Sequence, residues 1–216
     1  MLIDGASLWL AETNSWVFAA ERGGLAVVID APPDPDGVGA LLARHELTPV
    51  ALLATHGHAD HIGGAGDVVS RFAMSAYLHP DDGWLATDPR EQLKALWGML
   101  PPGEFSSPQR WESLSDGAVL ALAGFEVEVI HTPGHTPGHC CFHVPAEGAL
   151  FSGDQLFAGS IGRTDLPGGD HGALMRSMGE RIVTLPEETV VLPGHGPTTT
   201  LAQELATNPF LERFRK

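Results

Sequence analysis

Cysteine and basic residues are both scarce in this sequence. Its two cysteines, Cys140 and Cys141, are adjacent, a spacing that suits neither a disulfide framework nor a thiolate metal cluster. We expect both to be small buried side chains in a strand. Lys and Arg number 12 against 27 Asp and Glu, so the net charge is −15 with histidine neutral. Because nucleic-acid binding requires a basic surface, we expect no nucleic-acid partner.

Long apolar runs are lacking too. No segment is long enough to span a bilayer, and the N-terminal MLIDGASLWLAETN has no basic region. We therefore expect neither secretion nor membrane insertion, and a cytoplasmic location. Hydrophobic residues nevertheless make up 43% of the 216 residues, and no linker or low-complexity tract interrupts them. Residues 1–216 are expected to form a single domain with a sizeable core.

Short apolar strands alternate with helical patterns along the chain, which indicates an α/β fold. The predicted strands are 25–30, 50–55, 75–80, 140–144, 149–154 and 190–195, and the predicted helices are 37–46, 62–72, 91–99, 171–185 and 201–211. Two hairpins are expected, one pairing SWVFAA with LAVVID and the other pairing AVLAL with FEVEVI. Asp170 is placed to cap the N-terminus of the fourth helix.

The most informative residues follow the ends of strands. THGHADHIGG (55–64) comes after PVALLA, HTPGHTPGH (131–139) follows another strand, and the strand-end stretches FSGDQ and LPGHGP come later. At each place an apolar strand ends, a glycine or proline turns the chain, and a histidine or aspartate lies at the edge of the sheet. Rigid strands thereby hold these side chains while loops present them.

Histidine and carboxylate side chains in this arrangement are ligands for divalent metal ions, and we expect two ions per chain. The predicted ligands of one ion are His56, His58 and His135, and those of the other are Asp60, His61 and His195. Asp154 supplies a carboxylate able to bridge both ions. Two neighbouring cations hold a water between them and lower its pKa toward neutrality, which indicates hydrolysis.

The string HGHADH, followed in order by PGH, SGD and LPGHG, resembles the metallo-β-lactamase fold superfamily from about the first hairpin to His195. The resemblance implies a four-layer αβ/βα sandwich with the metal site at the edge between two sheets. The ligands of the family fall on the seven residues named above, each of the expected type. Zinc is the metal most expected, with iron or manganese as alternatives, because this donor set accepts all three.

The loop GSIGRTDLPGGD (159–170) is similar to that of compact bacterial glyoxalase-II-like proteins, the hydroxyacylglutathione hydrolase group. This resemblance implies a small-molecule thioester substrate such as S-lactoylglutathione, cleaved by a metal-bound hydroxide while a thiolate leaves. Asp60 is expected to bind metal and, as the catalytic residue, to orient the nucleophile. Arg163 and Asp165 either position substrate or pair with each other, and His171 is a further candidate on the substrate side.

Two other activities stay open at this point. Persulfide dioxygenases share the fold and a similar GRTD loop but use a single Fe(II), bound by the residues that match His56, His135 and Asp154. The continuation LPGG (166–169) is closer to the hydrolase group, which ranks the hydrolase first. An acyl lactone hydrolase would carry much the same HTPGHTPGH segment. The oligomeric state is not indicated.

The thiol carrier and the roles of several side chains stay open as well. The larger glyoxalase II enzymes bind glutathione with basic and tyrosine side chains of a C-terminal helical extension, whereas the last residues of this sequence are NPFLERFRK and it has one tyrosine, Tyr77. The segment from Trp84 to Trp111 either forms an apolar lid or packs on the core. The histidines expected to be hydrogen-bonded or solvated, and not ligands, are His45, His79, His131, His139 and His143.

Overall fold

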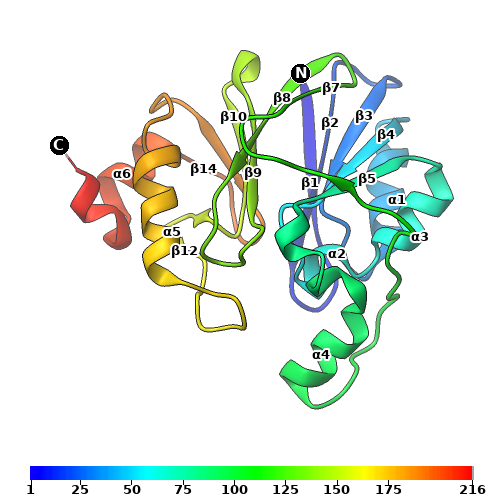
Figure 1. Ribbon diagram of the computed structural model, residues 1–216. Helices are drawn as coiled ribbons and strands as arrows, with labels where there is room; N and C mark the ends of the chain where they lie inside the picture. The colour runs from blue at the N-terminus through cyan, green and yellow to red at the C-terminus, as the bar shows by residue number, and fades with distance from the viewer. Residues whose placement is uncertain (216) are drawn as a thin grey trace.

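The computed structural model describes residues 1–215, so that Lys216 of the predicted domain lies outside the described residues. Two six-stranded sheets lie face to face, and helices cover the outer face of each (Figure 1). The first sheet is formed by the chain up to Ser113 and the second by the chain from Val119 onward. This succession of helix, sheet, sheet and helix is the four-layer αβ/βα sandwich that the sequence predicts.

The strands of the first sheet lie in chain order. They are β1 (Leu2–Leu8), β2 (Thr13–Ala19), β3 (Leu25–Ile29), β4 (Thr48–Leu53), β5 (Ser75–Leu78) and β6 (Glu112–Ser113). The first three pair antiparallel and the last four pair parallel, which requires crossover connections. Helices α1 (Pro35–Arg44) and α3 (Ala65–Phe72) lie in two of these crossovers, and their residues Val38, Leu41 and Val68 are buried against the sheet.

The second sheet has the order β14-β13-β10-β9-β8-β7. Its strands are β7 (Val119–Leu122), β8 (Phe125–His131), β9 (Cys140–Val144), β10 (Ala149–Gly153), β13 (Val190–Pro193) and β14 (Thr199–Thr200). A small hairpin of β11 (Leu156–Phe157) and β12 (Ser160–Ile161) follows β10. Helices α5 (His171–Ser177) and α6 (Leu201–Thr207) cover the outer face, where Leu174 and Leu201 are fully buried.

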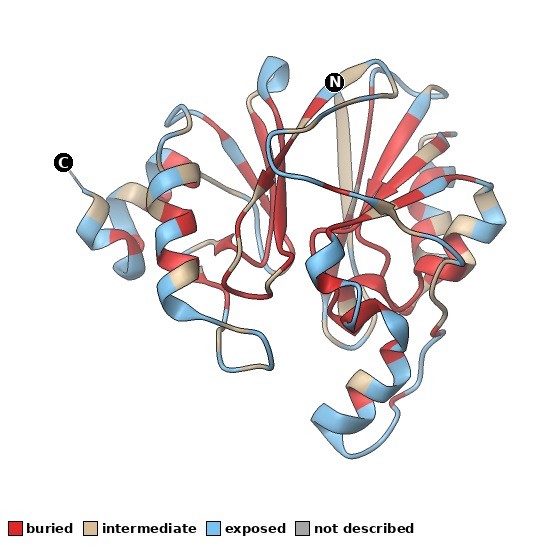
Figure 2. Cartoon of the chain, in the orientation of Figure 1, coloured by how far each residue is buried: buried red, intermediate tan, exposed pale blue. Residues whose placement is uncertain are grey.

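Buried apolar side chains of the two sheets form a core between them, and Figure 2 shows buried residues along the strands of both sheets. Phe18 of β2 stacks on Phe151 of β10 with ring centroids 5.1 Å apart, and both rings are fully buried. Each buried aromatic side chain contributes on the order of 2 kcal/mol through removal of its surface from water. Cys140 and Cys141 are buried in β9, as predicted. The packed sheets fix the positions of the loops at their common edge.

The six predicted strands and both hairpins are confirmed, with ends that differ by at most two residues. The helix predicted over 62–72 is interrupted near its start: α3 begins only at Ala65, and Ile62 ends a separate short helix, α2 (Ala59–Ile62). The interruption has a tertiary cause: the backbone of Ala31 donates to the carbonyl of His61 at 2.7 Å and accepts from the N–H of Gly64 at 3.0 Å. These hydrogen bonds compete with a continuous helix and fix the loop that follows β4.

The helix predicted over 171–185 is shorter than expected, because α5 ends at Ser177 and passes into a π-helical turn (Met178–Ile182). Its predicted cap is confirmed: the carboxylate of Asp170 accepts from the N–H of Ala173 at 2.9 Å. Helix α4 (Pro89–Trp97) projects from the edge of the sandwich below α2 (Figure 1). None of the helices within residues 1–215 is both long and apolar enough to span a membrane.

Candidate metal centre

Four loops at one edge of the sandwich carry the seven predicted metal ligands. The loop after β4, with α2, provides four of them, and the loops after β8, β10 and β13 provide one each. In chain order they are His56, His58, Asp60, His61, His135, Asp154 and His195. Segments far apart in the sequence thus meet at one pocket, and the ligand atoms fall into close groups.

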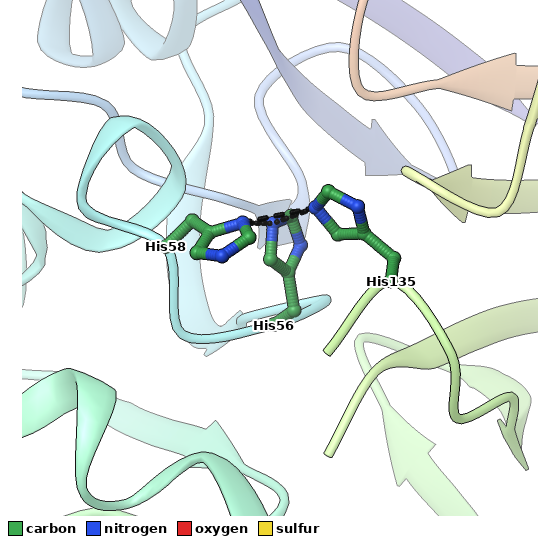
Figure 3. Close-up of side chains that lie close together, drawn as sticks. All are labelled: His56, His58 and His135. Carbon is green, nitrogen blue, oxygen red and sulfur yellow. Dashed lines mark hydrogen bonds between the residues drawn. The ribbon is translucent and has the colours of Figure 1, made fainter. Parts of the chain in front are cut away.

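Three imidazoles form the first group (Figure 3). Nδ1 of His58 lies 3.1 Å from Nε2 of His56 and 2.9 Å from Nε2 of His135, and these two Nε2 atoms are 3.2 Å apart. A tetrahedral ion that binds imidazole nitrogens at about 2.0–2.1 Å holds them roughly 3.3 Å apart. The spacing of this group therefore suits a single metal ion.

The opposite nitrogens of two of these rings are already engaged. Nδ1 of His56 lies 3.0 Å from Oγ1 of Thr55, which donates its own proton to Asp30, so the ring is the donor. Nδ1 of His135 donates to the carbonyl oxygen of Arg163 at 2.7 Å. A neutral imidazole that donates through Nδ1 has a lone pair at Nε2. The two Nε2 atoms are 3.2 Å apart, so their lone pairs repel each other. A cation between them would accept both lone pairs and remove this repulsion.

The second group consists of Asp60, His61 and His195. The Nε2 atoms of His61 and His195 are 3.2 Å apart, and Oδ2 of Asp60 lies 3.5 Å and 3.3 Å from them, respectively. The hydroxyl of Thr13 donates to the same carboxylate oxygen at 3.2 Å and holds it in place. Two imidazole nitrogens and one carboxylate oxygen form a donor set that zinc, iron and manganese accept.

Asp154 lies between the two groups. Its Oδ2 is 3.5 Å from Nε2 of His135, and its Oδ1 is 3.4 Å from Nε2 of His61. Within residues 1–215 this Oδ1 is buried without a hydrogen-bond partner. Leaving a buried polar atom unsatisfied costs about 1–3 kcal/mol, a penalty that a bound cation would remove. The backbone N–H of Asp154 donates to Nε2 of His139 at 3.0 Å, which fixes the loop.

The buried carboxylate of Asp30 orients ligands of both groups. It accepts hydrogen bonds from the N–H and hydroxyl of Thr55 at 2.7 and 2.8 Å and from Nδ1 of His61 at 2.8 Å. Such partners fix the tautomer and the ring orientation of a histidine ligand. Sequence reasoning missed Asp30, although a signal was present: it ends the predicted strand LAVVID, just as Asp154 ends ALFSGD.

A second buried carboxylate, Asp82, joins two of the ligand loops. Its Oδ2 accepts from the N–H of Gly57 at 2.8 Å and from the hydroxyl of Thr136 at 2.6 Å, and its Oδ1 accepts from the N–H of Gly138 at 2.6 Å. Gly57 lies inside the HGH stretch, and Thr136 directly follows His135. Asp82 therefore couples the segments that carry the first group. Sequence reasoning missed it because HPDD reads as an ordinary polar turn.

Burial and charge set different protonation states in the two groups. Burial and a neighbouring histidine lower the pKa of His58 to about 3, and burial lowers the pKa of His56 well below its ordinary value. Burial also opposes a charged His61, but the three carboxylates around it raise its pKa to about 10. His56 and His58 are therefore neutral at pH 7 and ready to bind metal, whereas metal binding to Nε2 of His61 releases a proton.

The three residues predicted on the substrate side lie in different places. Arg163 lines the pocket, and its guanidinium pairs with the carboxylate of Asp165 at 2.7 and 2.8 Å. The two side chains thus pair with each other, at an exposed position beside the pocket. His171 begins α5 and lines a separate depression beside Met175 and Arg176, so the fold does not bring it to the metal ligands.

The remaining histidines are hydrogen-bonded, as expected. Their contacts are His45 with Asp4, His79 with the N–H of Asp81, His131 with the carbonyl of Pro137, His139 with the N–H of Asp154, and His143 with Glu128. The segment from Trp84 to Trp111, predicted either to form an apolar lid or to pack on the core, does both in different parts. Leu93, Leu96 and Trp97 of α4 line the pocket, whereas Phe105 packs edge-on against Trp9.

Comparison with known proteins identifies the family. A sequence profile of the Metallo-beta-lactamase superfamily matches residues 9–195, a range that contains all seven ligands. The chain is 41% identical over 222 residues to an uncharacterized protein of Mycobacterium tuberculosis, with 98% of each chain covered. It is 36% identical over 187 residues to the hydroxyacylglutathione hydrolase GloC of Haemophilus influenzae, with 86% of this chain and 87% of the relative covered.

Solved structures agree with the profile. The BLEG-1 B3 metallo-beta-lactamase superposes with a TM-score of 0.88 at 39% identity, covering 97% of this chain and 99% of that one. TTHA1623 in a di-iron-bound form superposes with a TM-score of 0.82 at 40% identity, covering 96% of this chain and 100% of that one. Profile, sequence identity and fold all lead to one conclusion: the chain belongs to the metallo-beta-lactamase superfamily.

Proposed function

We propose that this member of the superfamily is a dinuclear metal-dependent hydrolase that cleaves small-molecule thioesters such as S-lactoylglutathione. The observation that carries the proposal is the position of Asp154, whose carboxylate faces both groups of three ligands. The buried Oδ1 of this carboxylate, which has no hydrogen-bond partner in residues 1–215, supports a bridging role. Similarity to GloC, a hydroxyacylglutathione hydrolase, supports a thioester as the substrate.

Two bound ions would lower the pKa of water toward neutrality and polarise the substrate carbonyl. The residues of the chain position the reactants. Asp60 reaches the pocket wall, where its carboxylate would accept a hydrogen bond from the attacking water and orient it. The departing thiol has an ordinary pKa of about 8.5, so it leaves as a thiolate with little need of a protonating side chain.

A thiol of the chain itself is not placed to act as the nucleophile. Cys140 and Cys141 lie buried in β9, and burial raises the pKa of Cys141 to about 12. A reactive cysteine needs an exposed thiolate of lowered pKa, and these two have the opposite properties. Direct attack by water is therefore the mechanism that we propose.

The donor set accepts zinc, iron and manganese alike. A relative 40% identical to this chain is solved in a di-iron-bound form, which supports iron as a candidate beside zinc. We therefore propose two divalent ions per chain, with zinc and iron as the first metals to load.

A mononuclear Fe(II) persulfide dioxygenase is the second candidate. Its three ligands would be His56, His135 and Asp154, and these lie close enough: the two Nε2 atoms are 3.2 Å apart, and Oδ2 of Asp154 is 3.5 Å from that of His135. A single iron would use only these three ligands, whereas the proposed hydrolase would also use Asp60, His61 and His195, which form a second group. This second group favours the hydrolase.

Activity of the metal-loaded protein tests the proposal. Zinc-loaded and iron-loaded samples are assayed with S-lactoylglutathione and with glutathione persulfide under oxygen. An acyl lactone is also assayed, because an acyl lactone hydrolase is the third activity considered. A β-lactam is assayed because BLEG-1 is described as a B3 metallo-beta-lactamase. Thioester cleavage without oxygen uptake supports the hydrolase. Oxygen consumption with persulfide by the iron form, with no thioester cleavage, would replace it by the dioxygenase.

A further inference from the structure

A pocket of about 540 Å³ lies directly in front of the candidate metal ligands. Two apolar walls line it. Leu93, Leu96 and Trp97 of α4 form one wall, and Phe157, Ile161 and Leu166, which lie on and after the β11–β12 hairpin, form the other. Pockets of this kind bind the apolar part of a ligand and orient it with a few polar groups, here the metal ligands.

Two of the three side chains of the α4 wall, Leu96 and Trp97, are exposed to solvent and are not part of the core. The exposed fractions of Leu96 and Trp97 are 43% and 50%, whereas Leu93 beneath them is only 3% exposed. Large apolar side chains that remain exposed beside a site, and that continue an apolar patch into a pocket, are typical of ligand-binding surfaces.

Helix α4 is held in a defined place over the metal loop. The side-chain amide of Gln92 donates to the carbonyls of Gly57 and Leu85 at 2.8 and 2.6 Å and accepts from the N–H of Ala59 at 3.3 Å. The ring of Trp97 stacks on Trp9 with centroids 5.7 Å apart and planes 4° apart. The wall is therefore preformed, and little ordering of the protein is needed when a ligand binds.

Positive side chains are scarce in the same pocket. Within residues 1–215, the lining includes one Arg or Lys, Arg163, and its guanidinium already pairs with Asp165. Glutathione carries two carboxylates, which need charged or hydrogen-bonding partners when they are bound. The chain as a whole adds no attraction for such an anion, because its net charge is −15.

From the two apolar walls and the single, engaged arginine, we infer that this pocket selects thioesters with a bulky apolar acyl group or thiol carrier over S-lactoylglutathione. The inference rests on the proposed thioester hydrolase activity and adds the substrate class. The apolar group would lie against Leu96 and Trp97, while the thioester carbonyl faces the metal ligands.

Four thioesters test the inference with the metal-loaded protein. They are S-lactoylglutathione, the lactoyl thioester of N-acetylcysteamine as a small neutral reference, the phenylacetyl thioester of N-acetylcysteamine, and the lactoyl thioester of benzyl thiol. Each kcat/KM is divided by the rate of uncatalysed alkaline hydrolysis of the same compound. We expect a phenyl group on either the acyl side or the thiol side of the thioester to raise the corrected kcat/KM about tenfold over the reference. Comparison of the two phenyl compounds shows on which side of the thioester the pocket binds the apolar group. We expect the corrected kcat/KM of S-lactoylglutathione to be no higher than that of the lactoyl reference.

Two variants connect this preference to the α4 wall. Trp97→Ala and Leu96→Ala should each reduce the preference for the phenyl compound by about threefold or more, where the preference is the ratio of its corrected kcat/KM to that of the lactoyl reference in the same variant. Phe210→Ala is the matched control, because Phe210 is similarly exposed at 46% and does not line the pocket. A preference for S-lactoylglutathione that neither wall variant changes would overturn the inference and leave the proposed function in place. Cleavage of none of the four compounds would overturn the proposed function and the inference with it.

Discussion

The buried carboxylate of Asp30 accepts a hydrogen bond from Nδ1 of His61 at 2.8 Å, so that Nε2 of the same ring faces the second group of ligands. The two residues come from different strand-end loops of one sheet, and Thr55 completes the arrangement by donating both its N–H and its hydroxyl to Asp30. A single carboxylate thus sets the direction in which His61 presents its lone pair once the proton of Nε2 is lost.

The variant Asp30→Asn tests this relationship. In either orientation an asparagine places its amino group against a donor, the ring of His61 or the N–H of Thr55, so one hydrogen bond is lost or His61 changes tautomer. We expect the affinity for the second metal ion to fall about 10- to 100-fold. Isothermal titration of the metal-free protein measures it. Asp36→Asn is the control, since that carboxylate is 80% exposed and pairs with Arg71; Asp30→Asn with unchanged affinity at both sites would contradict this role.

The variant Asp82→Asn tests the junction between the two ligand loops. Asparagine keeps one acceptor where the carboxylate has two, so a buried N–H of Gly57 or Gly138 is left without its partner. We expect the free energy of unfolding to fall by about 2 kcal/mol, which lowers Tm by about 6 °C in a chain of this size. Differential scanning calorimetry of the metal-free protein measures the shift. Asp81→Asn is the control, because it changes the adjacent, exposed carboxylate. Equal shifts of Tm in both variants would contradict the role of Asp82 in joining the two ligand loops.

The ion pair between Asp116 and Arg181 makes a small contribution to stability that depends on pH. Two hydrogen bonds of 2.8 Å from the guanidinium lower the pKa of the Asp116 carboxyl. Because the folded-state pKa is depressed, the contribution is complete above the unfolded-state value of about 3.9 and is lost as the pH falls through the folded-state value. Both side chains are more than a third exposed, so solvent screening limits the pair to about 0.5 kcal/mol.

Urea unfolding of wild type and Asp116→Asn across a pH series measures this contribution. The difference in free energy of unfolding should be about 0.5 kcal/mol at pH 7 and should vanish at a pH below the depressed pKa of Asp116. A difference that stays constant over the whole series would show that the variant acts through something other than the charge of Asp116, for example its hydrogen bond with the backbone N–H of His131.

The residues that the sequence predicted best are those tied to strand ends. His135 and Asp154 each follow an apolar strand that is easily recognised, and strands of packed sheets end at a common edge, so the sequence alone indicates that the two residues converge. Local sequence patterns also predicted the individual strands and helices, whereas their arrangement in two packed sheets came from the resemblance to the metallo-β-lactamase fold.

Asp82 and Gln92 show where this reasoning stops. Each acts through hydrogen bonds to the backbone of the HGHADH stretch, at Gly57 and Ala59, and neither has a spacing that indicates a function. Their roles depend on which loops the tertiary fold brings together. The interruption of the predicted helix 62–72 has a partly similar origin, since backbone hydrogen bonds to Ala31, distant in sequence, act where Gly63 and Gly64 already weaken the helix.

Titration of activity against added metal tests the central claim most directly. Metal-free protein receives zinc or iron in steps from zero to four equivalents, and the initial rate of cleavage of the best thioester substrate is measured at each step. With Asp154 as a bridge between two groups of ligands, the rate should rise to a plateau at two equivalents, with elemental analysis giving two ions per chain. A plateau at one equivalent, with one ion per chain and full thioester turnover, would contradict the dinuclear account.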